Sequence, residues 1–551
     1  MGVASIAPVV VSHPDILGAF VERHFRRHPV TASFTGVTAY DHHLPDWTRA
    51  GREDARREIS DLRRSLDAAP PISDAALAAA ALDIEAAELD ALHFHRRNPC
   101  LYTAEATFGV IALMLRHHAP PDERAAAMVT RLATISSFLD AASVSLDQPA
   151  PGLWIDRAVA ECTAARNLFL AGLDVWSVEE GVSESLRADL NAVGAAAAVA
   201  LAGFAGWLEA EPRDENAGSG ADHLTLLLRK AHWRTESPHE LLEQMYADLE
   251  RATTAWRSSA PGDAWPDVRE RLAQRHPVPD QYLARFQETW AVSRSTALQH
   301  DLLTWPDFPI EYRQMPQWAR AAAPHLYFLF YRSPPVVDGP AVHRYLVPAI
   351  DGEPPDAVAS VLRATNDWVI KSNHVVHHGG IGHHVQNTRA RNGQSLIGRV
   401  AGIDGAARLA LPCAGTLAEG WACYATDVMA EYGFFTEDQL IAHQHAQVRQ
   451  VARGIVDIEL HMGRRTLTEA IAFLAGATEM PEAAARREVT RTSMFPGTGL
   501  LYWLGTTTLH AVRRDLEPRY GSLRAFHDRV LRDGSVPVAL IRERMSAEGA
   551  R

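Results

Sequence analysis

The chain has 551 residues, of which 47% are hydrophobic and 22% charged, so it has ample material for a folded core. Its formal net charge of −13 argues against a nucleic-acid or anionic-membrane partner. Its four cysteines lack Cys-x-x-Cys spacing, the N-terminus lacks the basic start of a signal peptide, and no apolar run is long enough for a membrane-spanning helix. These features predict a cytoplasmic protein with reduced thiols.

Helical periodicity dominates the first 300 residues. Residues 51–68 repeat apolar side chains at helical spacing, and residues 75–97 form an Ala/Leu/Glu-rich helix that we expect to end at Asn98-Pro99. Further helices of this kind are expected over 122–147, 156–176, 183–211, 238–258 and 279–300. The alanine run at 194–201 is better explained by a tightly packed helix than by disorder. The polar, glycine-containing stretch Asp214–Gly220 predicts a loop.

Strand-like segments are few and follow these helices. Leu326–Tyr331 and Val342–Val347 are rich in aromatic and β-branched residues and lie beside Pro- and Gly-containing turns, which predicts a small sheet or hairpin. No linker or internal repeat divides the sequence. We therefore expect one mainly α-helical domain over residues 1–551, with an N-terminal helical part of about 1–320 and a second part of about 321–551.

The most informative segment begins in that second part. It contains five histidines, arranged so that two His-His pairs enclose a run of small residues: His374, His377, His378, His383 and His384. About 35 residues later comes an acidic Glu-Gly-Trp-Ala sequence that begins at Glu419. Neutral imidazole is the commonest protein ligand of transition metals, and a distant carboxylate often completes such a site. The pattern therefore predicts a metal centre rather than a His-rich turn whose rings bond locally.

Helix geometry limits which of these residues can share one ion. On an unbroken α-helix, residues six or seven apart are separated by roughly 9 to 10.5 Å along the axis, too far for bonds of about 2 Å. His377 can share a metal with His383 or His384 only if the glycine-rich residues 379–382 interrupt the helix. We favour His377, His383 and Glu419 as ligands, with His384 as a near-equal alternative to His383. His374, one turn before His378, either supports that ring or lies on the surface.

Four motifs in the second half resemble those of one known family. They are His377–Gln386, Glu419–Ala422, the triplet Arg453, Asp457 and His461, and Pro496–Gly505. They resemble His-Glu-x-x-Pro-Gly-His-His-x-Gln, Glu-Gly-Trp-Ala, Arg-x-x-x-Asp-x-x-x-His and Pro-Gly-Gln-Ala-x-x-Tyr-x-x-Gly, the motifs of the bacterial domain-of-unknown-function family 885. That family is thought to be related to gluzincin zinc peptidases. The resemblance implies a single large helical domain of zinc-peptidase-like architecture with a deep central cleft.

The resemblance also implies roles for residues outside the histidine segment. His461 and Tyr502 occupy the positions at which gluzincin-like sites stabilise a developing oxyanion. Arg453 either binds substrate or forms a structural pair with Asp457, because both lie on one helical face. From the sequence alone, Arg491, five residues before Pro496, either holds a substrate carboxylate through two hydrogen bonds or, by default, is a surface arginine.

Two positions depart from the family motif. His378 replaces the glutamate that takes a proton in related zinc peptidases, and Ile381 replaces a proline. His378 can accept a proton or bind the metal itself. The residue-by-residue match therefore supports the metal site, while the departure weakens the assignment as a peptidase. The remaining histidine pairs have no carboxylate motif nearby and are predicted not to bind metal: His42-His43, His93 and His95, His117-His118, and His443 and His445.

Three functions remain open at this point. We favour a metal-dependent enzyme that acts on a small molecule in a specialised biosynthetic pathway, with chemistry that has moved away from general peptide hydrolysis. The alternatives are a zinc-dependent amidase or peptidase that uses His378 as base, and a non-catalytic relative that binds a ligand. The expected cofactor is a divalent metal, with zinc preferred over iron, manganese or copper. The expected partner is a small molecule, with neither nucleic acid nor membrane.

Overall fold

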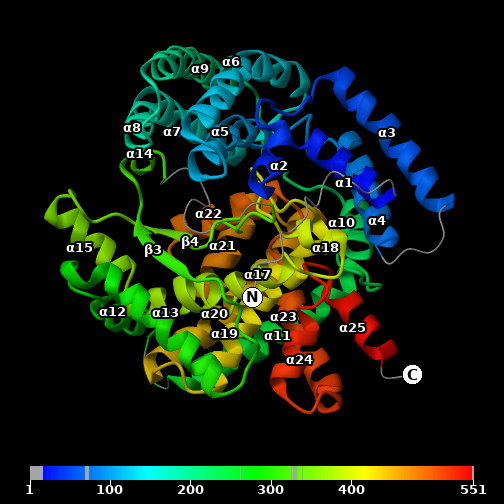
Figure 1. Ribbon diagram of the computed structural model, residues 1–551. Coiled ribbons are helices and arrows are strands. Elements are labelled where there is room, and N and C mark those ends of the chain that lie inside the picture. The colour runs from blue at the N-terminus through cyan, green and yellow to red at the C-terminus, as the bar shows by residue number, and fades with distance from the viewer. Residues whose placement is uncertain are drawn as a thin grey trace, which may run out of the picture.

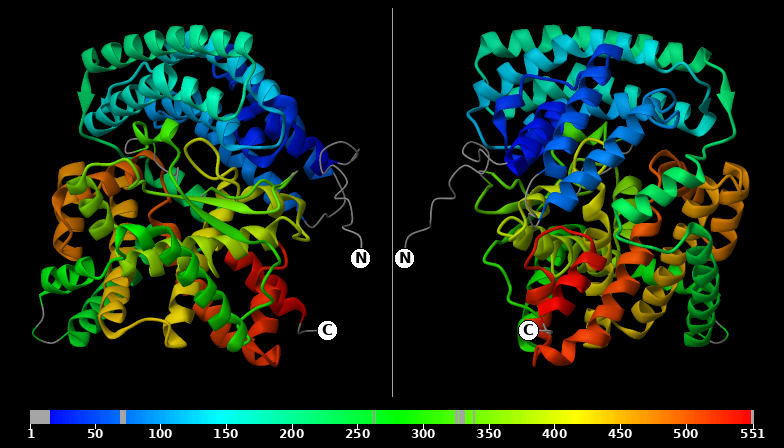
Figure 2. Two further views of the ribbon diagram at one scale, coloured as in Figure 1. Left: turned by 60° about the vertical axis from the view of Figure 1, so that its left-hand side comes forward. Right: turned by 90° about the vertical axis from the view of Figure 1, so that its right-hand side faces the viewer.

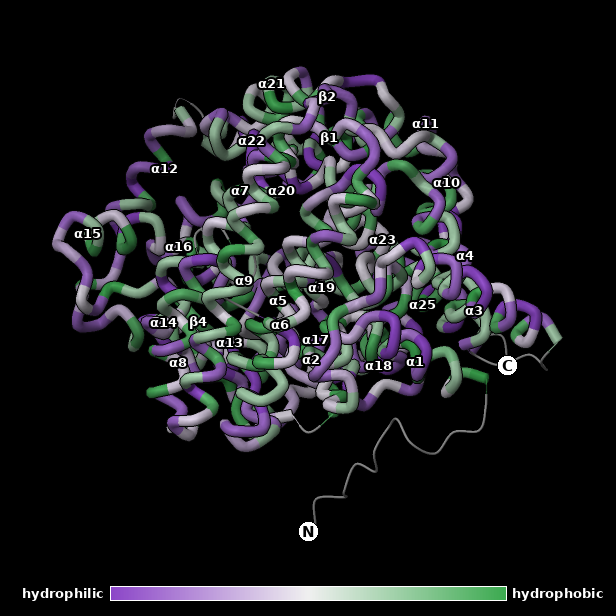
Figure 3. Tube along the Cα trace, turned by 90° about the horizontal axis from the view of Figure 1, so that it is seen from above, coloured by the Kyte–Doolittle hydropathy of each residue, from purple (hydrophilic) through white to green (hydrophobic). Residues whose placement is uncertain are grey.

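The protein is described here by a computed structural model that covers residues 16–68, 74–260, 262, 264–323, 326, 332–337 and 339–548. These residues form a mainly helical body with two small sheets (Figure 1). Two views in Figure 2 show the helices α5 to α9 as a layer that lies over the C-terminal part of the chain. Seen from above in Figure 3, hydrophilic and hydrophobic residues alternate along the outer helices, as expected for helices with one buried face.

The bounds of the helices follow the chain. The N-terminal part contains α1 (Ile16–Arg27), α2 (Pro29–Thr35), α3 (Arg49–Ala68), α4 (Ala75–Asp90), α5 (Pro99–Leu115), α6 (Pro121–Ser145), α7 (Gly152–Asn167), α8 (Leu173–Glu179) and α9 (Glu184–Ala210). The middle contains α10 (Ala221–Lys230), α11 (Pro238–Ser259), α12 (Trp265–Gln274), α13 (Tyr282–Gln299), α14 (Gln317–Arg320), α15 (Pro355–Ala364) and α16 (Asp367–Val369). The C-terminal part contains the π-helix Ile370–Gly379, α17 (His383–Ala390), α18 (Leu396–Ala401), α19 (Gly415–Glu431), α20 (Glu437–His461), α21 (Leu467–Thr478), α22 (Glu482–Met494), α23 (Leu500–Leu516), α24 (Leu523–Val530) and α25 (Val538–Glu548).

Most of the helices predicted from periodicity are confirmed. The segments now seen as α3, α6, α9, α11 and α13 lie where the sequence placed them, and 156–176 forms α7, a π-helical turn and α8 in one run. The helix predicted over 75–97 is too long, because α4 ends at Asp90. Asn98-Pro99 begins a helix instead of ending one. The Asn98 side chain accepts a hydrogen bond from the Cys100 N–H, and Pro99 occupies the first turn of α5, where no donor is needed.

The small sheet precedes the histidine segment, as predicted, but it is not a hairpin. Strand β4 (His343–Val347) confirms the second predicted strand, and it pairs in parallel with β3 (Ile310–Gln314), which the sequence analysis missed. The first predicted strand, Leu326–Tyr331, falls almost entirely outside the described residues. A second, two-residue pairing joins β1 (Ala150–Pro151) to β2 (Arg213–Asp214).

One apolar core connects the two parts of the chain. Leu113, Trp154 and Leu201 from the N-terminal layer belong to the same buried cluster as Val456 and Ile471 from α20 and α21. A shared core of this kind is what defines a single domain. The prediction of one mainly helical domain is therefore confirmed.

Helix α9 departs from the sequence-based expectation about apolar segments. By length and composition, it is the one helix among the described residues that could cross a membrane. Only 33% of its most apolar window is buried inside the protein, so the alanine run at 194–201 is packed on one face only. The buried face contacts α6 and α7 within the N-terminal layer.

The close crossing of α19 and α23 positions two residues of the cavity described below. A Cβ at Gly420 would lie 2.5 Å from the Gly505 Cα, and a Cβ at Gly505 would lie 2.1 Å from the Thr416 carbonyl oxygen. The two helices therefore meet backbone to backbone, which only glycine permits. Glu419 precedes one of these glycines, and Tyr502 lies one helical turn before the other. The crossing thus places both side chains near the same wall.

A matched pair of glycine substitutions tests this crossing. Gly420→Ala should lower the free energy of unfolding by about 1–3 kcal/mol, because the added methyl group overpacks a backbone contact. Gly203→Ala in α9 should raise it by roughly 0.5–1 kcal/mol, because nothing lies within 4 Å of the new Cβ and alanine favours the helix. Urea unfolding followed by circular dichroism measures both. Equal effects at the two positions would contradict the crossing.

Candidate metal centre

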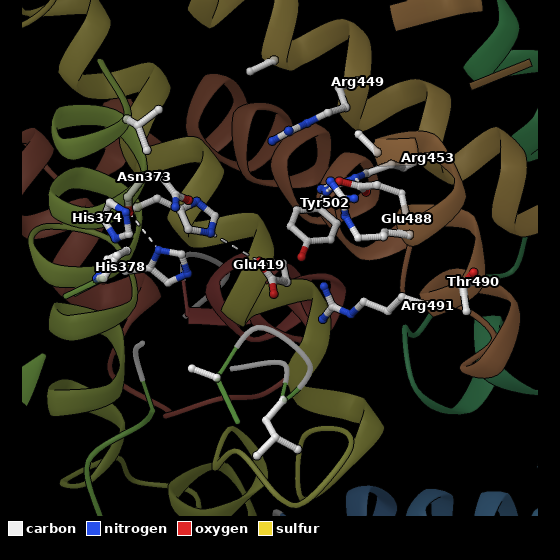
Figure 4. Close-up of a pocket in the computed structure, with 18 of the residues that line it drawn as sticks. Asn373, His374, His378, Glu419, Arg449, Arg453, Glu488, Thr490, Arg491 and Tyr502 are labelled. Carbon is white, nitrogen blue, oxygen red and sulfur yellow. Dashed lines mark hydrogen bonds and ion pairs between the residues drawn. The ribbon is translucent and has the colours of Figure 1, made fainter. Parts of the chain in front are cut away.

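A large cavity lies where the N-terminal layer meets the C-terminal helices. Its volume is about 1220 Å³, and its lining comes from α5 and α7 on one side and from the π-helix, α19, α20, α22 and α23 on the other. Figure 4 shows part of this lining, with His378 and Glu419 on one side and Arg449, Arg453 and Arg491 on the other. The candidate metal ligands and the candidate substrate-binding residues therefore share one space.

The helix interruption required by the histidine spacing is present. The π-helix ends at Gly379, and α17 begins at His383. Between them the chain turns so tightly that a Cβ at Gly382 would lie 2.1 Å from the His377 carbonyl oxygen. The rings of His377 and His383 are consequently 4.7 Å apart between centroids, although an unbroken helix would separate these residues by roughly 9 Å.

Three imidazoles and one carboxylate converge at this turn. The candidate ligand atoms of His377, His378 and His383 lie within 4.8 Å of one another. Glu419 Oε2 lies 3.6 Å from both His377 Nε2 and His383 Nε2, and it is buried without a hydrogen-bond partner among the described residues. A buried carboxylate oxygen in that situation is costly unless a cation approaches it. The donor set fits a divalent metal such as zinc, iron or manganese.

The ionisation of the cluster also suits a cation. Burial alone would raise the pKa of Glu419, yet the adjacent imidazoles of His377 and His383 hold its pKa well below the usual value. Burial lowers the pKa of His377, against the opposing influence of Glu419. At neutral pH the site therefore presents a carboxylate and a neutral imidazole, which are the protonation states that bind metals.

His378 presents a nitrogen lone pair to the cluster. Its Nδ1 lies 2.8 Å from the Asn373 carbonyl oxygen, which can only accept, so Nδ1 carries the hydrogen and Nε2 carries the lone pair. Burial, and then the neighbouring rings of His377 and His383, lower the pKa of His378 well below its usual value. A hydrogen bond of this kind on the far nitrogen is typical of metal-binding histidines.

His374 is buried instead of lying on the surface, and it belongs to the same π-helix as His377 and His378. It is 7% exposed, and its Nδ1 lies 2.7 Å from the Tyr345 hydroxyl oxygen. Burial lowers its pKa to about 4. The Tyr312 hydroxyl also donates to the His374 carbonyl oxygen, which anchors the π-helix to β3.

His384, the near-equal alternative ligand, points elsewhere. Its Nε2 lies 2.8 Å from the Phe308 carbonyl oxygen, and its ring stacks on Phe308 with an interplanar angle of 14°. The residue is fully buried, which lowers its pKa to about 4. Of the two histidines that begin α17, His383 is therefore the one that belongs to the cluster.

The two residues predicted to stabilise an oxyanion, Tyr502 and His461, lie in different surroundings. Tyr502 lines the cavity, and the Arg453 guanidinium lies 5.0 Å from the centre of its ring. In Figure 4 the Tyr502 side chain points toward the part of the cavity that Glu419 and Arg491 also face.

His461 does not fit the predicted oxyanion role. It is fully buried, its Nε2 lies 3.1 Å from the Thr492 carbonyl oxygen, and its Nδ1 accepts a hydrogen bond from the Ser219 N–H. Asp457 accepts hydrogen bonds from the Gly497 and Leu500 N–H groups, and burial raises its pKa to about 7. These two residues hold the chain that leads into α23, and they position Tyr502 indirectly.

For Arg453, one of whose two alternative roles was a structural pair with Asp457, the structure shows a pair with a glutamate on another helix. Arg453 pairs with Glu488 of α22 through two hydrogen bonds. Arg449, four residues earlier on α20, lines the same cavity, as does Arg491. Sequence reasoning missed Arg449 and Glu488. The i, i+4 spacing of Arg449 and Arg453 was the available signal, because such residues share a helical face.

Two of the histidine pairs predicted not to bind metal have carboxylates beside them. His118 Nε2 lies 3.0 Å from Asp41 Oδ2. His443 Nε2 lies 2.9 Å from Asp427 Oδ1, and His510 Nε2 lies 2.7 Å from the other oxygen of Asp427. The three residues come from α20, α19 and α23, so their sequence separation hid the contact. The sequence shows no carboxylate motif beside these histidines, because the carboxylates come from other elements, and their assignment as non-ligands stays a prediction.

Comparisons with known proteins agree with this architecture. The family model described as "Bacterial protein of unknown function (DUF885)" matches residues 29–545. The solved structure of a "putative lipoprotein of unknown function" from Shewanella oneidensis aligns with a TM-score of 0.73 and 19% identity, over 97% of this chain and 100% of that one. That of a "putative lipoprotein" from Colwellia psychrerythraea aligns with a TM-score of 0.74 and 16% identity, over 97% and 98%. No curated protein matches the chain.

One expectation is overturned by these comparisons. The two solved structures above that share the fold are both described as a "putative lipoprotein". The predicted cytoplasmic location is therefore wrong. That prediction depended in part on features at the start of the chain, and residues 1–15 lie outside the described residues.

Gly382→Ala tests the turn that builds the histidine cluster. Its Cβ would overlap the carbonyl oxygens of His377 and Val376, at 2.1 and 2.6 Å, so the turn must open and the rings must separate. We expect metal affinity to fall by at least about tenfold, measured by competition with a chromogenic chelator. Gly476→Ala in α21, where nothing lies within 4 Å of the new Cβ, is the matched control and should leave affinity unchanged. Unaltered affinity in Gly382→Ala would place the metal elsewhere.

Proposed function

The chain belongs to the DUF885 family, and within it we propose that this protein is a metal-dependent enzyme acting on a small molecule, on a gluzincin-like scaffold. The proposed ligands are His377, His378, His383 and Glu419. The observation that carries the proposal is the convergence of three imidazole nitrogens, within 4.8 Å of one another, beside an ionised carboxylate whose Oε2 is buried. They lie on the wall of a cavity of about 1220 Å³, large enough for a drug-sized molecule.

A divalent cation bound by these residues supplies Lewis-acid chemistry, with redox chemistry added if the metal is iron, manganese or copper. Zinc is the preferred candidate, and a set of three histidines with one glutamate also suits the redox metals. The chain itself supplies the position of the ligands. Asn373 fixes the tautomer of His378, and the turn at 379–382 brings His383 beside His377.

The remaining residues of the cavity orient and stabilise the substrate. Tyr502 offers a phenolic O–H as a hydrogen-bond donor to negative charge that develops on a substrate oxygen. The Arg453 guanidinium stacked on its ring limits the motion of that side chain. Hydrogen bonds from Gly497 and Leu500 to Asp457 hold the chain segment from which Tyr502 projects.

General peptide hydrolysis is not the proposed activity. Related zinc peptidases use a glutamate to take a proton at the position of His378, and here an imidazole takes its place. In our proposal the His378 Nε2 lone pair binds the metal. It is then not available to accept a proton, and no other proton acceptor stands at that position. The proposed enzyme therefore cleaves ordinary dipeptides poorly.

One alternative is favoured by a specific observation. His378 Nε2 is unprotonated at neutral pH, because burial lowers the pKa of this ring and Nδ1 carries the hydrogen. The same lone pair can accept a proton instead of binding the metal. The protein would then be a zinc-dependent amidase or peptidase with His378 as its base. The ligand and base roles predict different metal contents after the same substitution.

Glu419→Gln tests the ligand set. Removing the charge that partly neutralises the cation should lower the metal content of protein purified without added metal by more than about tenfold, while the fold is kept. His384→Gln is the matched control, because His384 contacts the Phe308 carbonyl oxygen and not the cluster. Elemental mass spectrometry measures the metal content of both variants. Full occupancy in Glu419→Gln would remove this carboxylate from the site, and metal-free wild-type protein would favour a non-catalytic ligand-binding relative.

His378→Ala separates the two roles of that residue. We expect the His378→Ala variant to bind metal more weakly, because a ligand has been removed. Any hydrolysis of acyl-amino acids should be lost with the metal. Retained metal with a rate lowered by roughly 10²–10⁴-fold would identify His378 as the base. The wild-type protein should hydrolyse ordinary dipeptides only slowly, and efficient cleavage of them would also support the peptidase alternative.

A further inference from the structure

The wall of the cavity opposite the metal centre carries a cluster of arginines. Arg449 and Arg453 lie four residues apart on α20, while Glu488 and Arg491 lie three residues apart on α22, and the two helices pack together. All four side chains line the same cavity as His377, His378 and Glu419. Figure 4 shows these four side chains grouped beside Tyr502. We call them the arginine cluster.

The arginine cluster has an excess of positive charge. Three guanidinium groups accompany one carboxylate, which leaves two positive charges in a protein whose formal net charge is −13. The three arginines act on the same carboxylate. Burial would raise the pKa of Glu488, but Arg453, Arg449 and Arg491 together hold its pKa at about 2. Glu488 is therefore ionised at any physiological pH, and these four side chains together carry a net charge of +2.

Two arginines elsewhere on the lining of the cavity form ion pairs with acidic residues. Arg157 forms an ion pair with Glu161 at 2.6 Å, and Arg320 forms one with Asp351 at 2.9 Å. The described lining of the cavity has seven arginines and five carboxylates, and five of these arginines lie on α20 and α22. The positive charge of the lining is therefore concentrated where these two helices face the cavity. The Arg453 side chain is only 12% exposed and Glu488 is 22% exposed, so water screens the cluster less than it would on the surface.

We propose that the arginine cluster binds an oxyanion group, a carboxylate or a phosphate, of a small anionic substrate. Guanidinium groups recognise both groups through paired hydrogen bonds, and partly buried positive charge is stabilised by an anion that replaces lost water. Tyr502 lies between the cluster and the metal centre, so the reacting part of the same molecule extends past Tyr502 toward His378 and Glu419. This second step rests on the proposed function. Anion binding by the cluster does not, because it requires no metal.

Calorimetry on the intact, metal-free protein tests the anion site. Glutarate, which carries two carboxylates, should bind at least ten times more tightly than glutaramide, its neutral counterpart of nearly the same shape. Inorganic phosphate, titrated in parallel, distinguishes the two oxyanions, because the natural group should bind more tightly. Equal affinity for glutarate and glutaramide, or no binding of glutarate and phosphate, would overturn the proposal.

Charge variants locate the site. Arg491→Gln should weaken glutarate binding about 10- to 100-fold, as expected when one charged hydrogen-bonding group is lost. Glu488→Gln should tighten binding, because it removes the one competing carboxylate. Arg64→Gln, on exposed α3, is the control and should have no effect. Weaker binding in both cluster variants would mean that these residues act only as a scaffold, and it would overturn the proposal.

The metal-centre variant separates this inference from the proposed function. Glu419→Gln should lose metal but keep its affinity for glutarate. If the wild-type protein contains no metal and yet binds glutarate through Arg491, the proposed function fails while the anion site stands. If metal is bound but Arg491→Gln leaves glutarate affinity unchanged, the anion site fails while the metal centre stands.

Discussion

The candidate site depends on one constraint, the interruption of the helix between Gly379 and His383. Without it, His377 and His383 would be separated by about 9 Å along a helix axis and could not share an ion. A Cβ at Gly382 would lie 2.1 Å from the His377 carbonyl oxygen, so the turn leaves no room for a side chain at this position. Two indole N–H groups then fix the turn. Trp290 donates to the Gly379 carbonyl oxygen at 2.7 Å, and Trp421 donates to that of Ile381 at 2.9 Å.

The second of these hydrogen bonds explains the Glu-Gly-Trp sequence physically. Glu419 supplies the carboxylate, Gly420 permits the backbone contact with Gly505 of α23, and Trp421 ties α19 to the histidine turn. Tyr502 lies one turn before Gly505, so the same helix crossing places it beside the carboxylate. A metal ion on one wall and the arginine cluster on the other would both attract anions. We therefore propose that this acidic protein encloses a cavity suited to an anionic molecule.

Much of this arrangement could be predicted from local sequence, and the failures have identifiable causes. Periodicity located the long helices, and the spacing of His377 and His383 required an interrupted helix. The choice between His383 and His384 could not be made, because it depends on the rotation with which α17 leaves the turn. His461 belongs to a family motif, yet its ring is held by hydrogen bonds with the backbone of Thr492 and Ser219, which are distant in the sequence. Glu488 and Asp427 were missed because their partners lie on other helices, where no spacing rule applies. Asn98-Pro99 was read as a stop although it also has the chemistry of a helix start.

The central claim is that His377, His378, His383 and Glu419 hold one metal ion. Anomalous X-ray diffraction from crystals of protein purified without added metal, collected on both sides of the absorption edge of the bound element, tests it most directly. We predict a single peak at roughly 2.0–2.2 Å from the imidazole nitrogens and a carboxylate oxygen of these residues. A peak that excludes His378 would support its role as a base. A peak elsewhere, or none in protein that binds no metal in solution, would contradict the account.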